Sequence, residues 1–116
     1  MGVGMTLAES YLRHTIENIS EDAQGLVDHF TYVLASDGDL QEPVSLGAAS
    51  LAGHLELSRL IVFYDANEAQ VSGHTSRSDS TNYASVFEGF NWHVPFSYTH
   101  LTLPTNSPDY MQLFSF

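Results

Sequence analysis

The chain has 116 residues, of which 43% are hydrophobic and 12% aromatic, and this length and composition predict a single compact domain. Its 14 acidic and three basic residues give a net charge of −11, which makes nucleic acids and anionic membrane surfaces poor partners. The absence of cysteine excludes disulfides and thiolate chemistry. One interpretation of this acidity is a solvated face that keeps the chain in solution. The other is that any phosphorylated ligand would need a divalent cation to offset its repulsion by the chain.

The sequence shows no feature of a membrane or secreted protein. No apolar run approaches the roughly 18 residues that a bilayer span requires. The N-terminus lacks the basic start and apolar stretch of a signal peptide. We therefore expect a cytoplasmic protein without a membrane partner.

The first predicted element is a helix over residues 5–19, where apolar side chains recur at spacings of three and four and form one stripe. A polar, acidic linker follows over residues 20–28. Residues 30–35 are β-branched and aromatic, which is typical of a short buried strand. The polar residues 36–38 end this strand.

A second helix is predicted over residues 42–57, which are small and apolar at helical spacing. Pro43 fits its first turn, because a proline there removes no intrahelical hydrogen bond. Residues 60–64 form a second strand without polar alternation, the pattern of a parallel strand covered on both faces. Strand, helix and strand together predict a βαβ unit with a right-handed crossover.

A third helix is expected after a polar loop, with Tyr83, Phe87 and Phe90 on one face. Residues 92–94 could begin a third parallel strand. The fold class is therefore α/β, a three-layer arrangement in which helices flank a partial parallel sheet. The last segment, residues 95–116, contains three prolines and one charged residue and does not continue this pattern.

Polar side chains follow both predicted strands, Asp37 after the first and Asn67 after the second. Neighbouring parallel strands lie about 4.8 Å apart, so the two side chains can converge on one ion. Carboxylate and amide oxygens suit Mg2+ or Ca2+, and a backbone carbonyl near Ala69 could be a third ligand. Gly38 would let the backbone approach a phosphate closely. Spacing alone leaves an alternative open, in which Asp37 and Gly38 form a simple turn and Asn67 caps a loop.

Three stretches resemble the thiamine-diphosphate-binding domain of transketolase: GVGMTLAE, VFEGFNWHV and DHFTYVLASDGDLQEPVSLGAASLAGHLELSRLIVFYDANEAQVSGHT. The resemblance covers residues 2–94. It implies that Asp37, Asn67 and the backbone carbonyl of Ala69 bind magnesium. It also implies that Gly38 contacts the diphosphate and that Glu42 belongs to a proton path between subunits.

The resemblance implies a thiamine-diphosphate- and magnesium-dependent transferase that moves a two-carbon ketol unit between sugar phosphates. In that family the active site lies between the subunits of a homodimer. Residues 1–94 would form an incomplete thiamine-diphosphate-binding domain, and residues 95–116 an unrelated or artefactual tail. We expect the isolated chain to bind the cofactor weakly and to turn nothing over.

The sequence departs from the family pattern at Ser36, Pro43, Gly47 and Ala66. Ser36 replaces a glycine and would distort the phosphate turn if that turn required a positive φ. An alternative for Glu42 is a carboxylate that is favoured by the dipole at a helix start. Two other functions stay open: a noncatalytic remnant or interaction module of the same fold, and another thiamine-dependent enzyme such as deoxyxylulose-phosphate synthase.

Overall fold

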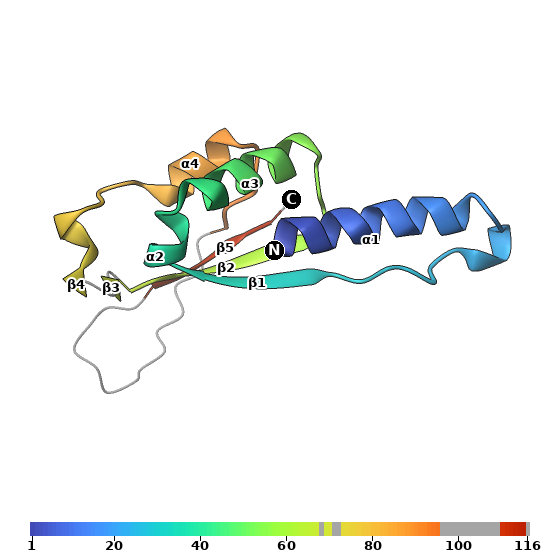
Figure 1. Ribbon diagram of the computed structural model, residues 1–116, viewed down its shortest axis with the longest axis horizontal. Coiled ribbons are helices and arrows are strands. Elements are labelled where there is room, and N and C mark those ends of the chain that lie inside the picture. Colours follow the sequence, from blue (N-terminus) through green and yellow to red (C-terminus); the bar gives the residue numbers. More distant parts are fainter. Residues whose placement is uncertain (68, 71–72, 96–109, 116) are drawn as a thin grey trace, which may run out of the picture.

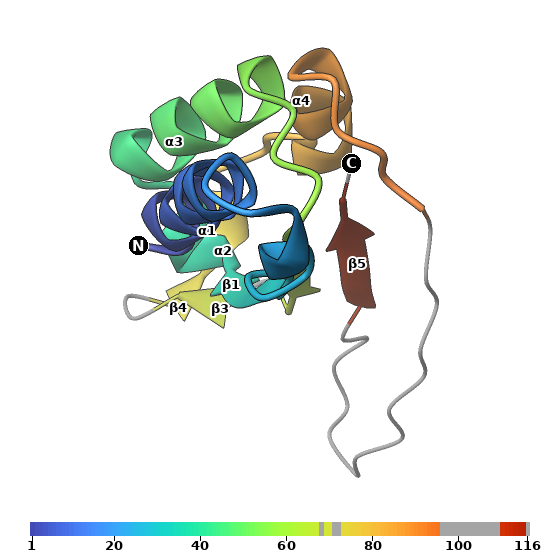
Figure 2. The same ribbon diagram turned by 90° about the vertical axis from the view of Figure 1, so that its right-hand side faces the viewer.

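The computed structural model describes residues 1–67, 69–70, 73–95 and 110–115. Helices lie on one face of a three-stranded sheet, as Figures 1 and 2 show from two sides. None of the helices formed by these residues is long and apolar enough to cross a bilayer. The elements, in chain order, are α1 (Gly2–Glu17), η1 (Glu21–Ala23), β1 (Thr31–Ser36), α2 (Asp37–Leu40), α3 (Pro43–His54), β2 (Leu60–Ala66), β3 (Ala69–Gln70), β4 (Gly73–His74), η2 (Thr75–Arg77), α4 (Tyr83–Gly89) and β5 (Tyr110–Phe114).

The predicted βαβ unit is confirmed. Strands β1 and β2 are parallel and in register from Thr31 opposite Leu60 to Ser36 opposite Asp65. Helix α3 connects them, and its first residue is Pro43, where a missing N–H costs no hydrogen bond. The α/β class with a partial parallel sheet and flanking helices therefore holds.

The third strand differs from the prediction. Residues 92–94 do not form a parallel strand, because β5 occupies the free edge of β2 and runs antiparallel to it. His93 makes only an isolated antiparallel bridge with Ser115. Pro95 comes two residues after His93 and has no N–H with which to extend a ladder. Whether residues 95–116 are unrelated to the preceding domain stays a prediction.

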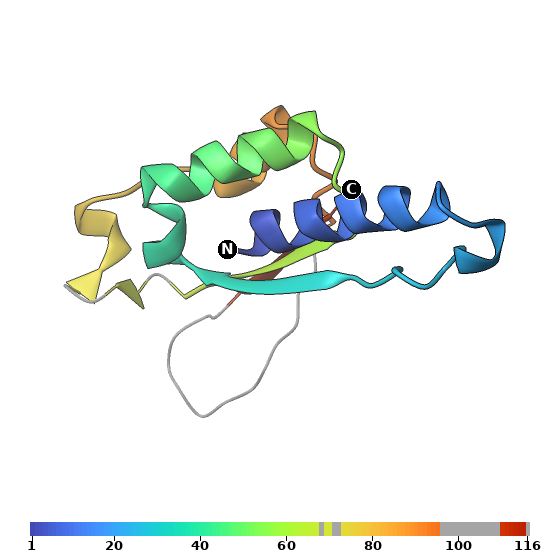
Figure 3. The ribbon, with the colours of Figure 1, turned by 45° about the vertical axis from the view of Figure 1, so that its right-hand side comes forward.

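The two faces of the sheet are covered unequally. Side chains of β2 alternate between buried and half-buried, and the buried ones belong to the core that includes Ala52 of α3 and Phe87 of α4. On the other face Tyr32 and Leu34 are 63% and 70% exposed, and the Tyr32 ring stacks on Phe63 at 6.3 Å. The described residues therefore supply two of the three expected layers, the sheet and the helices on one side (Figure 3).

The helices are where the sequence predicts them, but they turn different faces to the core. In α1 the buried side chains are Thr6 and Glu9, and in α3 they are Ala49 and Ala52 with Gly53. Of the predicted apolar stripes, Ala52 of α3 is buried as expected, whereas most of the other members do not face the core. They lie largely in solvent, with high exposure at Met5, Leu12, Ile19, Val44, Leu51 and Leu55.

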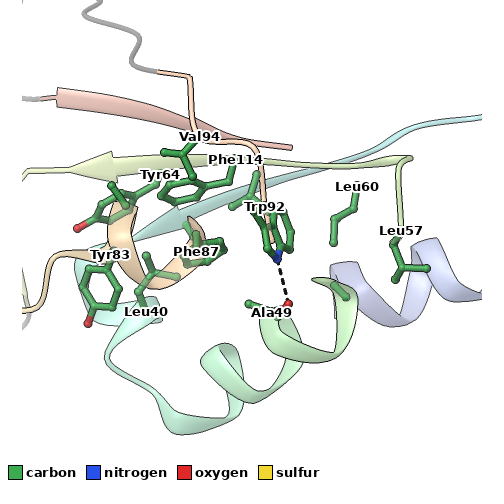
Figure 4. Packing of buried hydrophobic residues seen from close by; sticks show 14 residues of the cluster. Leu40, Ala49, Leu57, Leu60, Tyr64, Tyr83, Phe87, Trp92, Val94 and Phe114 are labelled. Atoms are coloured by element: carbon green, nitrogen blue, oxygen red, sulfur yellow. Dashed lines mark hydrogen bonds between the residues drawn. The ribbon is translucent and has the colours of Figure 1, made fainter. Parts of the chain in front are cut away.

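The core lies between the sheet and α4, and Figure 4 shows its aromatic centre. Phe87 of α4 stacks on Phe114 of β5 with ring centroids 4.1 Å apart, and Trp92 meets Phe87 edge-on at 5.2 Å. The Trp92 indole nitrogen donates a hydrogen bond of 3.0 Å to the Ala49 carbonyl. Burying each large ring contributes about 2–3 kcal/mol. This packing fixes α3, α4 and the sheet relative to one another.

Candidate functional site

The two strand ends that the sequence singled out lie at the same edge of the sheet. Ser36 is level with Asp65 in the parallel ladder. Asp37 follows β1 and Asn67 follows β2, so both residues come within two positions of this paired row. Helix α2 contacts both β2 and β3, which brings the backbone of Ala69 to the same corner. The ends of β1 and β2 thus lie at one corner of the fold, together with α2 and β3 (Figure 1).

Ser36 and Asp39 form the turn at the start of this corner. The Asp39 Oδ2 accepts hydrogen bonds of 2.9 Å from both the backbone N–H and the hydroxyl of Ser36. Ser36 and Asp39 form a capping box, and it converts the predicted turn into the one-turn helix α2. The φ of Ser36 is −110°, a conformation that any residue adopts. Serine in place of the family's glycine therefore causes no backbone strain.

Asp37 is the most unusual residue of the corner, because its carboxylate is buried and only half satisfied. The side chain belongs to a residue that is 6% exposed. Its Oδ1 accepts a short hydrogen bond from the Tyr64 hydroxyl. Its Oδ2 is buried and finds no hydrogen-bond partner among the described residues. A buried carboxylate oxygen without a donor is costly unless a cation binds it.

Asn67 is half-buried, and its orientation is set by a neighbour. The amide nitrogen donates a hydrogen bond of 2.9 Å to Asp65 Oδ2. Because the nitrogen of the Asn67 amide is directed at Asp65, the amide oxygen is directed away from Asp65. An amide oxygen of this kind is a hard ligand suited to Mg2+.

Gly38 lies inside the one-turn helix α2, and Glu42 lies at the start of α3. A Cβ on Gly38, in α2, would meet no atom of the described residues outside its own turn within 4 Å, so the space beside this backbone is open. Glu42 is the exposed N-cap of α3 and makes no side-chain capping hydrogen bond. Its place at a helix start agrees with the dipole interpretation. The proton-path role stays a prediction.

Sequence reasoning missed a tyrosine network beside Asp37. The Tyr64 and Tyr83 rings meet edge-on at 5.7 Å, and the Tyr83 hydroxyl donates to Asp79 Oδ2 at 2.6 Å. Burial, then the hydrogen bond to Asp37, raises the pKa of Tyr64 far above its usual range. The available signal was the period of two in β2, which places Tyr64 on the buried face. A buried tyrosine hydroxyl needs a partner.

Tyr83 and Asp79 are expected to stabilise the fold in a defined pH window. Burial, then the bond to Asp79, raises the pKa of Tyr83, while hydrogen bonds from Thr81 and then Tyr83 lower that of Asp79. The unfolded chain ionises its tyrosines near about pH 10 and protonates its aspartates near about pH 4. The folded chain therefore loses the tyrosine contribution as the pH rises above that upper value. It loses the aspartate contribution as the pH falls below about 4, where the aspartates of the unfolded chain take up protons.

We expect Tyr83→Phe to lower the free energy of unfolding at neutral pH by about 1 kcal/mol, since water screens the partly exposed Asp79. Above about pH 10 the variant should also lose stability less steeply than the unmodified chain. Urea unfolding followed by circular dichroism from pH 3 to pH 11 measures both effects. Equal alkaline slopes in the two proteins would contradict this assignment.

Comparison with known proteins identifies the family. A family model described as "Transketolase, thiamine diphosphate binding domain" matches residues 1–101. The transketolase of Bacillus subtilis is 50% identical over 94 residues, which are 81% of this chain and 14% of that relative. The chain belongs to the transketolase family. It spans about one seventh of the length of such relatives.

Solved transketolases share the fold described above. The transketolase from Leishmania mexicana matches with a TM-score of 0.72 and 39% identity, over 79% of this chain and 13% of its own. A Pichia stipitis transketolase in complex with sedoheptulose-7-phosphate matches with a TM-score of 0.73 and 37% identity, over the same shares. The α/β sheet of this chain is thus a part of a transketolase thiamine-diphosphate-binding domain, and the relatives named here are transketolases rather than deoxyxylulose-phosphate synthases.

Proposed function

We propose that this chain supplies the diphosphate- and magnesium-binding half of a transketolase thiamine-diphosphate site. The observation that carries the proposal is the buried Oδ2 of Asp37, which has no partner among the described residues. A divalent cation at this oxygen would remove the cost of burying an unpaired charge. The neighbouring Asn67 amide oxygen and Ala69 carbonyl are ligands of the same hard type, so the residues present fit Mg2+ or Ca2+.

The acidity of the chain explains why the cation is needed for the cofactor. With a net charge of −11, the chain repels a diphosphate unless positive charge lies between them. Asp37, Asn67 and the Ala69 carbonyl would hold the cation, and the open backbone of Gly38 would contact the diphosphate. Thiamine diphosphate, when bound, supplies an electron sink for carbon–carbon bond cleavage.

The complete enzyme would transfer a two-carbon ketol unit between sugar phosphates as a homodimer, in the cytoplasm. The Pichia stipitis relative solved with sedoheptulose-7-phosphate supports a sugar phosphate as substrate. Glu42 would belong to the proton path between subunits. Since this chain spans about one seventh of its relatives, we expect it to bind cofactor weakly and to catalyse no ketol transfer alone.

Isothermal titration calorimetry with thiamine diphosphate tests the proposal. We expect binding heat when Mg2+ or Ca2+ is present and none when EDTA removes both. Heat that does not depend on the cation would contradict the assigned ligands. Silence under all conditions would favour the noncatalytic interaction module, which keeps the fold without the site.

A further inference from the structure

Tyr64 touches the proposed site but belongs to no ligand set. It lies on the helix-facing side of β2, directly opposite Ala35 in the parallel ladder, and is 5% exposed. From there its hydroxyl reaches the Asp37 carboxylate, two residues further along the neighbouring strand end. The interaction joins residues that are 27 positions apart in the chain. Tyr64 is therefore placed by the sheet, not by local turn geometry.

The ring of Tyr64 is fixed by aromatic packing. Phe114 stacks against it at 5.9 Å with an interplanar angle of 17°, and Tyr83 meets it edge-on at 73°. Figure 4 shows the ring between these two neighbours. Because side chains in a packed core cannot turn freely, the hydroxyl stays directed at Asp37.

This contact makes the two oxygens of Asp37 unequal. The Tyr64 hydroxyl occupies Oδ1, whereas Oδ2 is buried and has no partner among the described residues. The carboxylate can therefore offer one oxygen to a cation while the tyrosine holds the other. One-oxygen coordination suits the strict octahedron of Mg2+, whereas Ca2+ accepts more ligands and often takes both oxygens of a carboxylate.

We propose that Tyr64 is a positioning residue that keeps Asp37 a one-oxygen ligand and thereby favours Mg2+ over Ca2+. This inference depends on the proposed function, since it requires that Asp37 binds the cation. It assigns to Tyr64 a role in choosing the metal. Outer-shell partners of metal ligands commonly change metal affinity by 10- to 100-fold when they are removed.

The test compares thiamine diphosphate binding by the whole chain in Mg2+ and in Ca2+, before and after Tyr64→Phe. The variant keeps the ring, so the aromatic packing should survive. We divide the dissociation constant of thiamine diphosphate in Ca2+ by its dissociation constant in Mg2+. In Tyr64→Phe we expect this ratio to fall by about tenfold, because both Asp37 oxygens become available to the cation. Tyr83→Phe is the matched control: it removes a partly buried hydroxyl from the same cluster and should leave the ratio unchanged.

A second measurement isolates the hydrogen bond without any cation. Unfolding midpoints of Tyr64→Phe, Asp37→Asn and the double variant form a double-mutant cycle, and we expect the two changes to be non-additive. Additive changes, or an unchanged metal ratio in Tyr64→Phe, would overturn the role of Tyr64 while leaving the proposed function standing. If the unmodified chain shows no cation-dependent binding, the proposed function and this inference both fail.

Discussion

Gly53→Ala is expected to remove a large part of the stability of this chain. Gly53 lies on the buried side of α3, where the helix packs against the residues that follow α4. A Cβ at this position would overlap the carbonyl oxygen of Phe90 and lie 3.4 Å from Cδ1 of Trp92. The obstructing atom belongs to the backbone, so no change of rotamer can relieve the overlap.

The expected cost is at least about 3 kcal/mol, the upper end for overpacking, because α3 and the end of α4 must move apart. A domain of this size has a total stability on the order of 5–15 kcal/mol, so such a loss is large. Urea unfolding followed by circular dichroism measures it. The displacement of α3 should also weaken the hydrogen bond from Trp92 to Ala49. The fluorescence of Trp92, the single tryptophan of the chain, measures this change in its surroundings.

Gly47→Ala is the matched control in the same helix. A Cβ at Gly47 would meet no atom within 4 Å, and the residue is exposed. Alanine there should stabilise the chain by roughly 0.5–1 kcal/mol, because glycine is the weaker helix former. If the two alanine variants have similar stability, the close packing of α3 on Phe90 and Trp92 is wrong.

The sequence was sufficient to predict the βαβ unit because its signals are local. The apolar runs over residues 30–35 and 60–64 identify β1 and β2 within two residues of their observed ends. Pro43 marks the start of α3, where it takes the first helical position. These features depend on side-chain pattern and backbone chemistry within a few residues, which a sequence displays directly.

The features that were missed depend on contacts between distant segments. Strand β5 lies in a segment without a strand pattern, yet it pairs with β2 and buries Phe114 completely. The periodicity of apolar residues in α1 and α3 correctly predicted two helices. It does not show which other segment, if any, packs against the apolar stripe of each helix. Tyr32 and Leu34 likewise gave β1 the pattern of a fully buried strand, and both are exposed here.

One part of the candidate site could be predicted from the sequence, and another part could not. Parallel strands bring Asp37 and Asn67 to one edge, and this follows from topology alone. The contact between Asp37 and Tyr64 depends on strand register and on the rotamer of the tyrosine. A sequence shows only that a buried hydroxyl will find some partner.

Asp37→Asn is expected to abolish cation-dependent binding of thiamine diphosphate and to raise the stability of the cation-free chain. The substitution replaces a charged oxygen that has no donor among the described residues by a neutral group. A neutral buried polar group costs less to desolvate than a charge, so unfolding should require about 1 kcal/mol more. Calorimetry measures the loss of binding, and thermal unfolding in EDTA measures the gain in stability.

Asp28→Asn controls for the change in net charge. Asp28 lies before β1, at the opposite end of the sheet, and pairs with Arg59 in a partly exposed ion pair worth at most about 1 kcal/mol. This variant should bind thiamine diphosphate normally and be no more stable than the unmodified chain. If Asp37→Asn alone loses binding and gains stability, the carboxylate of Asp37 serves ligand binding and lowers the stability of the fold. Retained binding in Asp37→Asn would remove the residue from the metal site.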